Sequence, residues 1–136
     1  MRILALDYGT RRVGVAISDE LGMLARPLGF LTAEPFERFV EDLRRLVEAH
    51  GVGQIVVGMP RNMNGSYGAA AETVRAWMNR LEQVLSIPLV AWDERLTTVQ
   101  AQRMLHEAGL PGRKQRIRLD SSAATILLQS YLDRAS

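Results

Sequence analysis

Acidic residues follow two apolar runs of this chain, and another acid stands just ahead of its last helical pattern. Asp7 closes the first run, Asp93 and Glu94 follow the run 87–92, and Asp120 precedes the helical segment. In open α/β sheets, sites gather at the carboxyl ends of strands, so we expect these acids to meet at one sheet edge. Carboxylates converging without histidine or cysteine favour Mg²⁺ or Mn²⁺. Two such ions can activate water and stabilise the leaving oxygen in phosphodiester cleavage.

Each acid also has a purely structural interpretation. Asp7 could satisfy the backbone of the turn that holds Gly9 and Thr10. Asp120 suits the N-cap of a helix. The two acids after the run 87–92 could pair with Arg95 or simply begin a loop. The joint placement of the acids at one edge is what favours a metal site over these separate roles.

Basic residues are concentrated next to Asp120, where the segment 113–118 carries four basic side chains in six residues. A solvated loop is the plain interpretation, but a carboxylate site that holds phosphate needs nearby cations, which favours contact with a nucleic-acid backbone. Loop aromatics are few, Tyr8 and Tyr67, which argues against a dedicated single-strand binder. The predicted nucleic-acid contacts are Arg11, Arg12, Arg61, Asn62, Arg95, Arg113, Lys114, Arg116 and Arg118.

The composition narrows the class of protein. The 136 residues suit one domain, 1–136, and 47% hydrophobic with 24% charged residues is ordinary for a globular chain. A net charge of +2 gives no general basic character, and the absence of cysteine excludes disulfides and thiolate chemistry. His50 and His106 lie in helix-like segments without partners at ligand spacing. Without an apolar run of about 20 residues or a signal-peptide pattern, we expect a cytoplasmic protein with no membrane partner.

The spacing of apolar residues predicts the elements that position the acids. Their order indicates one mixed five-stranded sheet, an antiparallel three-strand meander joined to parallel strands, with helices on both faces. Gly14 and Ala16 share one strand face and would let a helix approach closely. The expected strands are 3–7, 12–18, 23–31, 54–60 and 87–92, and the expected helices are 36–51, 74–85, 97–109 and one beginning at Asp120. The apolar stripe of the helix 74–85 is expected to include Val84, and the last helix is expected to place Ala123 and Ala124 on its inner side.

Four ordered motifs resemble the YqgF family: the segments 6–14, 57–65 and 93–98, and Asp120 with the alanines at 123 and 124. These are bacterial ribonuclease-H-like proteins, described as pre-16S rRNA nucleases and as Holliday-junction-resolvase-like proteins. The resemblance implies an α/β ribonuclease-H-like fold and a nuclease that uses Mg²⁺ or Mn²⁺, with two ions expected. Carried over by motif, the metal ligands are Asp7, Glu94 and Asp120, with Asp93 as the alternative middle ligand.

The resemblance implies processing of the 5′ end of the 16S rRNA precursor, or, as an alternative, cleavage of branched DNA at Holliday junctions. Cutting paired strands would require two sites and hence a homodimer. Junction resolvases of this superfamily carry a further acid about one helical turn after the last aspartate, and here the segment 121–124 holds only serine and alanine.

Two other classes compete with a nuclease. Sugar-kinase and actin-like ATPases also begin with an Asp-x-Gly-Thr turn, but they build their cleft between two domains, and 136 residues hold only one. A non-catalytic RNA- or ribosome-binding module would keep the scaffold without the chemistry. Such a module predicts binding that needs no metal and survives the substitution Asp7→Asn.

Overall fold

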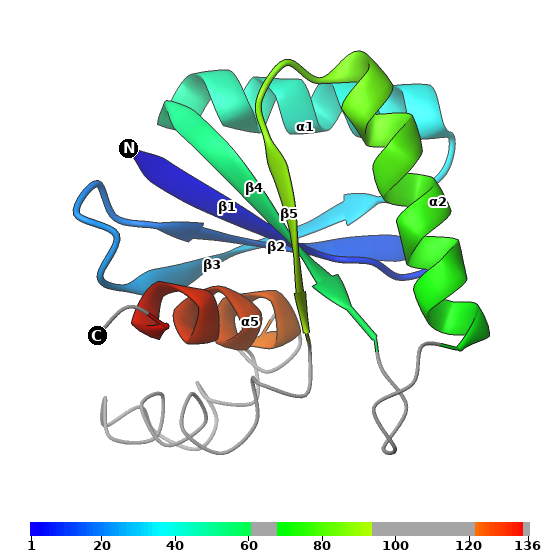
Figure 1. Cartoon of the computed structure of the whole chain (residues 1–136). Coiled ribbons are helices and arrows are strands. Elements are labelled where there is room, and N and C mark those ends of the chain that lie inside the picture. Colours follow the sequence, from blue (N-terminus) through cyan, green and yellow to red (C-terminus); the bar gives the residue numbers. More distant parts are fainter. Residues whose placement is uncertain (61–67, 94–121, 135–136) are drawn as a thin grey trace.

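The computed structural model describes residues 1–60, 68–93 and 122–134. Within these ranges the order of strands and helices is the predicted one, while the expected helix 97–109 lies outside the described residues. The elements are β1 (Arg2–Asp7), β2 (Arg12–Ser18), β3 (Ala25–Thr32), α1 (Phe36–His50), β4 (Val52–Met59), α2 (Ala69–Val84), β5 (Leu89–Asp93) and α5 (Ser122–Asp133) (Figure 1).

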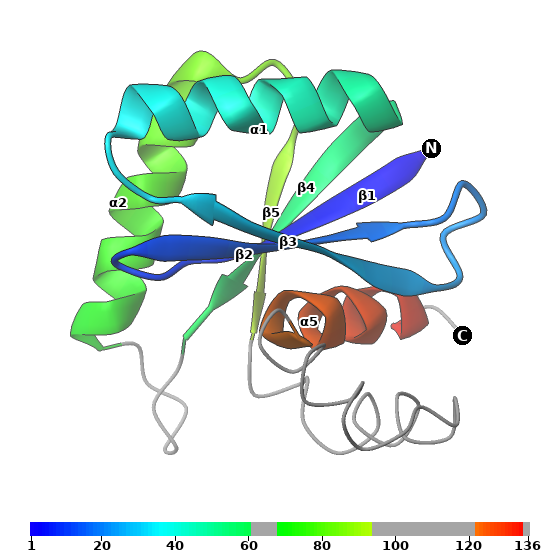
Figure 2. The same cartoon turned by 180° about the vertical axis from the view of Figure 1, so that it is seen from behind.

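The five strands form one sheet in the order β3-β2-β1-β4-β5, which confirms the predicted mixed sheet. β1 pairs antiparallel with β2, and β2 with β3, whereas β1 and β4, and β4 and β5, run parallel. Helices α1 and α2 cover one face and α5 covers the other (Figures 1 and 2). β1 is therefore the middle strand, and its carboxyl end lies at the same sheet edge as those of β4 and β5.

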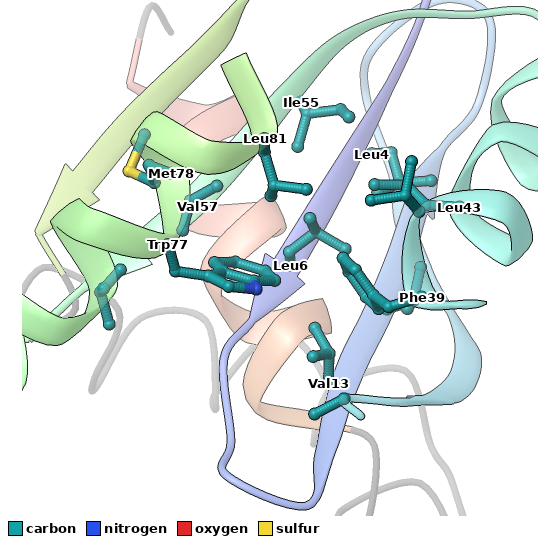
Figure 3. Close-up of a cluster of buried hydrophobic side chains, with 14 of the residues drawn as sticks. Leu4, Leu6, Val13, Phe39, Leu43, Ile55, Val57, Trp77, Met78 and Leu81 are labelled. Carbon is teal, nitrogen blue, oxygen red and sulfur yellow. The ribbon is translucent and has the colours of Figure 1, made fainter. Parts of the chain in front are cut away.

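The face under α1 and α2 carries the larger hydrophobic core. Alternate residues of β1, Leu4 and Leu6, point into it and are fully buried. Phe39 of α1 and Trp77 of α2 meet above them, with ring centroids 5.3 Å apart (Figure 3). The predicted stripe of α2 is confirmed except at its end, where Val84 is 38% exposed because the helix terminates there.

The opposite face carries small residues on β1 and β2, where Gly14 and Ala16 predicted the close approach of a helix. Ala5 and Ala16 face each other across β1 and β2 and are fully buried beneath α5. Ala124 of α5 is also fully buried, whereas Ala123, which we expected on the same inner face, is exposed. The helix is thus rotated so that Ala124 and the larger residues after it pack on the sheet.

Helix α5 is fastened to the turn between β2 and β3 by one buried side chain. The Gln129 Oε1 accepts a hydrogen bond of 2.9 Å from the Ala25 N–H, and the Gln129 Nε2 donates one of 2.9 Å to the Met23 carbonyl. Gln129 therefore completes the hydrogen bonding of the hairpin from the helix side. The opposite end of α5 points toward the carboxyl end of β1.

Candidate active site

Asp7 ends the middle strand and lies on the α5 face of the sheet. The alternation along β1 sets this direction, because Leu6 points into the α1–α2 core while Ala5 and Asp7 point the other way. Leu4, Ala5 and Leu6 are fully buried, whereas Asp7 is only half-buried. The carboxylate is therefore held on a rigid strand at the point where the sheet emerges into solvent.

Gly14 pairs with Asp7 across the β1–β2 ladder and fixes how closely α5 approaches it. A Cβ atom placed on Gly14 would lie 3.6 Å from the Asp7 Cβ and 3.6 Å from the Ala124 Cβ. The Asp7 side chain and the first turns of α5 thus border the same small space. The close approach predicted from Gly14 and Ala16 is confirmed, and it brings α5 to the strand that carries the carboxylate.

Arg12 lies on the same face as Asp7, two residues before Gly14 on β2. Its guanidinium carbon sits 3.9 Å from the ring centroid of Phe30 on β3. Both side chains are exposed, Phe30 to 37%. Arg11 is also exposed, and its carbonyl accepts a hydrogen bond of 3.0 Å from the Ala33 N–H. Two of the predicted basic contacts therefore stand near the carboxyl end of β1.

Phe30 was missed in the sequence, where only aromatic residues in loops were considered. Its direction depends on a bulge in the β2–β3 ladder, where Val15 pairs with Gly29 and Ala16 with Pro27. This irregularity sets the register, and Phe30 comes to pair with Gly14 on the site face. Tyr8, by contrast, was considered a loop aromatic, but its ring packs against Trp77 at 4.8 Å on the other face. Tyr8 is therefore a core contact and not a stacking surface for bases.

Asp93 ends β5 at the same edge as Asp7 but points to the opposite face. On β5, Val90 and Trp92 contact the α5 side, whereas Leu89 packs in the α1–α2 core. Asp93 alternates with Trp92 and accordingly lines an open pocket of about 230 Å³ beside α2, together with Arg75, Asn79 and Glu82. The structure thus brings Asp7 and Asp93 to one edge but places the sheet between their side chains.

Several predicted site residues lie outside the described residues. Among the acids these are Glu94 and Asp120, so the convergence of three carboxylates stays a prediction. The loop aromatic Tyr67 lies outside as well. The predicted nucleic-acid contacts that fall outside are Arg61, Asn62, Arg95, Arg113, Lys114, Arg116 and Arg118.

The described part of the site fits a hard divalent cation as far as it extends. Asp7 supplies carboxylate oxygens on a half-buried strand end, and Mg²⁺ or Mn²⁺ prefers such oxygen ligands. Within the described ranges there is no cluster of three or more acidic, histidine or cysteine residues that could hold an ion. A complete site therefore needs acids from the remaining segments, as the sequence predicts with Glu94 and Asp120. His50, at the end of α1, lies in the last turn of a helix, as expected.

The strand order, the mixed pairing and the acid that ends the middle strand define a ribonuclease-H-like fold. Solved structures agree: Thermus thermophilus RuvC in complex with a Holliday junction substrate superposes with a TM-score of 0.57, at 13% identity over 97% of this chain and 94% of RuvC. The fowlpox virus Holliday junction resolvase gives a TM-score of 0.55 at 15% identity, covering 98% of this chain and 99% of the resolvase. At these identities the likeness concerns the fold alone.

Comparison of sequences goes beyond the fold and assigns the chain to a family. The model of the RuvX family, described as a Holliday junction resolvase, matches residues 1–134, and the chain belongs to this family. The resemblance to YqgF proteins, the same family, is thereby confirmed. A Moorella thermoacetica protein named "Putative pre-16S rRNA nuclease" is 48% identical over 98% of this chain and 96% of its own length. A relative of the same name from Pelotomaculum thermopropionicum is 46% identical over 98% of this chain and 87% of its own length.

No helix in the described ranges combines the length and the apolar character that crossing a membrane requires.

Proposed function

We propose that this protein is a divalent-metal-dependent endonuclease that cleaves phosphodiester bonds in structured nucleic acid, with the 16S rRNA precursor as its substrate. The observation that carries the proposal is Asp7, a half-buried carboxylate at the end of the middle strand, with α5 packed closely beside it. The names of the relatives support ribosomal RNA as the substrate. In its most specific form, the proposal is that the protein processes the 5′ end of the 16S rRNA precursor.

Asp7 would hold the metal together with Glu94 and Asp120, the acids that the sequence places after the last strand and before the last helix. Asp93 is the poorer choice for the middle ligand, because its side chain lines the pocket beside α2 on the opposite face from Asp7. When bound, Mg²⁺ or Mn²⁺ supplies the activation of water and the charge stabilisation that phosphodiester hydrolysis needs.

The protein's own residues fix the position of the metal ligand and supply positive charge for the substrate. The rigid strand β1 holds the Asp7 carboxylate in a fixed place, which removes the entropic cost of orienting it during the reaction. Arg12, and Arg11 next to it, supply positive charge for the substrate backbone. The described part of the site contains no cysteine, and the proposed reaction uses water as its nucleophile without a covalent enzyme intermediate.

Holliday junction cleavage is the second version of this function. The description of the RuvX family and the fold shared with RuvC favour it. Cutting two strands of a junction requires two sites, so this version also predicts a homodimer. It differs from the first version in substrate, and both rely on the same carboxylates.

The test is a cleavage assay on precursor ribosomal RNA, single-stranded DNA and a four-way DNA junction, with Mg²⁺ or Mn²⁺. Wild-type protein should cleave one of them, and Asp7→Asn, Glu94→Gln and Asp120→Asn should each abolish cleavage without unfolding the protein. Asp93→Asn removes a neighbouring acid on the other sheet face and should keep cleavage, so it is the matched control. Absence of cleavage on every substrate would rule out the nuclease.

A binding assay separates the nuclease from a non-catalytic RNA-binding module. The module predicts that RNA binding is the same with and without metal, and that Asp7→Asn leaves both binding and every functional readout unchanged. The preferred substrate among those in the cleavage assay then decides between the ribosomal and the junction version.

A further inference from the structure

We propose that Phe30 is a positioning residue, which holds the Arg12 guanidinium as a contact for a phosphate that is not the one being cleaved. The proposal rests on the proposed function, because it places this contact relative to Asp7. Its physical basis is the cation–π contact of 3.9 Å between the Arg12 guanidinium and the Phe30 ring. A stacked guanidinium keeps its N–H groups at the edge of its plane, where they can donate to phosphate oxygens.

The pair lies on the site face because of the strand register. Asp7 pairs with Gly14, and Gly14 pairs with Phe30, so the three residues form one row across β1, β2 and β3. The Phe30 Cε1 atom lies 3.6 Å from where a Cβ on Gly14 would be, the same distance as the Asp7 Cβ. Gly14 thus leaves a gap about the size of one carbon atom between the Asp7 Cβ, the Phe30 ring and the Ala124 Cβ.

The spacing of strands indicates which phosphate Arg12 can reach. The backbones of Asp7 and Phe30 lie two strands apart, which corresponds to about 10 Å. Stacking on Phe30 draws the Arg12 guanidinium toward β3 and away from β1. We therefore assign Arg12 to a phosphate next to the one held at Asp7 on the same substrate strand. Loss of this contact should therefore weaken substrate binding and leave the chemical step unchanged.

The cation–π contact alone would not distinguish this pair from others in the protein. Arg80 lies 3.9 Å from the Phe36 ring, and Arg134 lies 3.7 Å from the Tyr131 ring. Arg80 belongs to α2, which covers the opposite face of the sheet from Asp7 (Figures 1 and 2). What sets Arg12 and Phe30 apart is that both are exposed on the same sheet face as the proposed metal ligand, and that Phe30 also lies in its row. Arg80 is accordingly the matched control for Arg12.

The test is a double-mutant cycle on binding, with fluorescent single-stranded RNA and a four-way DNA junction as probes and EDTA present to prevent cleavage. Phe30→Leu keeps an apolar side chain but removes the ring, and it should weaken binding about two- to fivefold. Phe30→Tyr keeps the ring and should restore wild-type affinity. Arg12→Gln should weaken binding and lower the slope of log affinity against log salt by about 0.7 to 0.9. In the Arg12→Gln background, Phe30→Leu should have no further effect.

Kinetics with Mn²⁺ supply a second readout. Phe30→Leu should raise KM and leave kcat unchanged, whereas a structural role in holding the site together would lower kcat as well. Arg80→Gln should change neither the affinity nor the salt slope by more than a small fraction of the Arg12→Gln effect.

Any of four results would overturn the proposal: additive effects of Phe30→Leu and Arg12→Gln, wild-type affinity in Phe30→Leu, equal salt slopes in Arg12→Gln and Arg80→Gln, or no binding of either probe by the wild-type protein. If the cycle is non-additive as expected but no substrate is cleaved with either metal, the contact between Arg12 and nucleic acid stands and the proposed nuclease function falls.

Discussion

Gly14 should tolerate substitution by alanine, which adds one carbon atom, but not by valine, which adds three. A Cβ there would lie 3.6 Å from the Asp7 Cβ, the Ala124 Cβ and the Phe30 Cε1. This separation is an ordinary contact between carbon atoms, so alanine fits the gap. Gly14 does not have a positive φ angle, and Gly14→Ala should therefore change the free energy of unfolding by less than about 1 kcal/mol.

Valine adds two methyl groups to the same Cβ atom. The three neighbours come from β1, β3 and α5, so every staggered χ1 angle directs at least one methyl group against one of them. Overpacking of this kind costs about 1 to 3 kcal/mol. It should also displace the Asp7 carboxylate or α5, and a misplacement of about 1 Å at a reacting group can lower the rate about 100-fold.

Urea unfolding followed by circular dichroism measures the stability, and the cleavage assay measures the rate. Ala124→Val fills the same gap from the helix side and should be destabilising by a similar amount, because Ala124 is fully buried. Ala123→Val places the same group on the exposed neighbouring residue and should cost only the helix propensity of valine, about 0.6 kcal/mol. Wild-type stability in both Gly14→Val and Ala124→Val would refute the close packing of α5 on β2.

Three further predictions concern the fastening of α5, the β2–β3 turn and the metal. Gln129→Leu leaves the Ala25 N–H and the Met23 carbonyl without their buried partner and should lower the free energy of unfolding by about 1 to 3 kcal/mol in urea titration. Hydrogen bonds from the backbone N–H of Leu24, and next from that of Met23, lower the pKa of Asp19 below its ordinary value of 3.8. Their stabilisation is therefore fully present above about pH 4 and is lost as the pH falls through the lowered pKa, so Asp19→Asn should flatten stability against pH only in that acid range. Removal of divalent metal with EDTA should abolish cleavage while circular dichroism stays unchanged, and Mn²⁺ or Mg²⁺ but not Zn²⁺ should restore it; cleavage that persists in EDTA would contradict metal dependence.

The sheet and its covering helices could be predicted because the spacing of apolar residues differs clearly between the strand segments and the helical segments of this chain. The alternation in β2, with Gly14 and Ala16 on one side, predicted that a helix packs closely on that face. Such patterns report which residues are buried but not how an element is rotated. For that reason Ala123 was placed on the inner face of α5, although it is exposed. The rotation is set by contacts with the sheet that are distant in sequence, such as the one between Ala124 and Gly14.

The site itself was harder to predict, for two physical reasons. Side chains alternate between the two sheet faces along a strand, so the face of the last residue depends on how many residues precede it in the strand. This alternation places Asp7 and Asp93 on opposite faces of the sheet. Asp93 and Glu94 could not be distinguished as metal ligands from the sequence, because they are adjacent and chemically alike. The bulge near Val15 likewise decides the direction of Phe30. Pro27 and Gly29 mark an irregularity in this strand, but these residue types do not determine which residues pair across it.

The burial of β1 explains why the carboxylate stands where it does. Leu4, Ala5 and Leu6 are fully buried, because helices cover both faces of the sheet at their level. One residue further, Asp7 is half-buried opposite the buried Gly14, and Arg12, two residues before Gly14 on β2, is exposed, so coverage by α5 ends just past the row of Asp7. A carboxylate one residue earlier would pay the full cost of desolvation, and one placed on a loop would lose its fixed position. The small residues beneath α5 therefore do more than fill the core: they bring the helix close and place its end beside Asp7, which leaves the carboxylate both rigid and accessible to a polyanionic substrate.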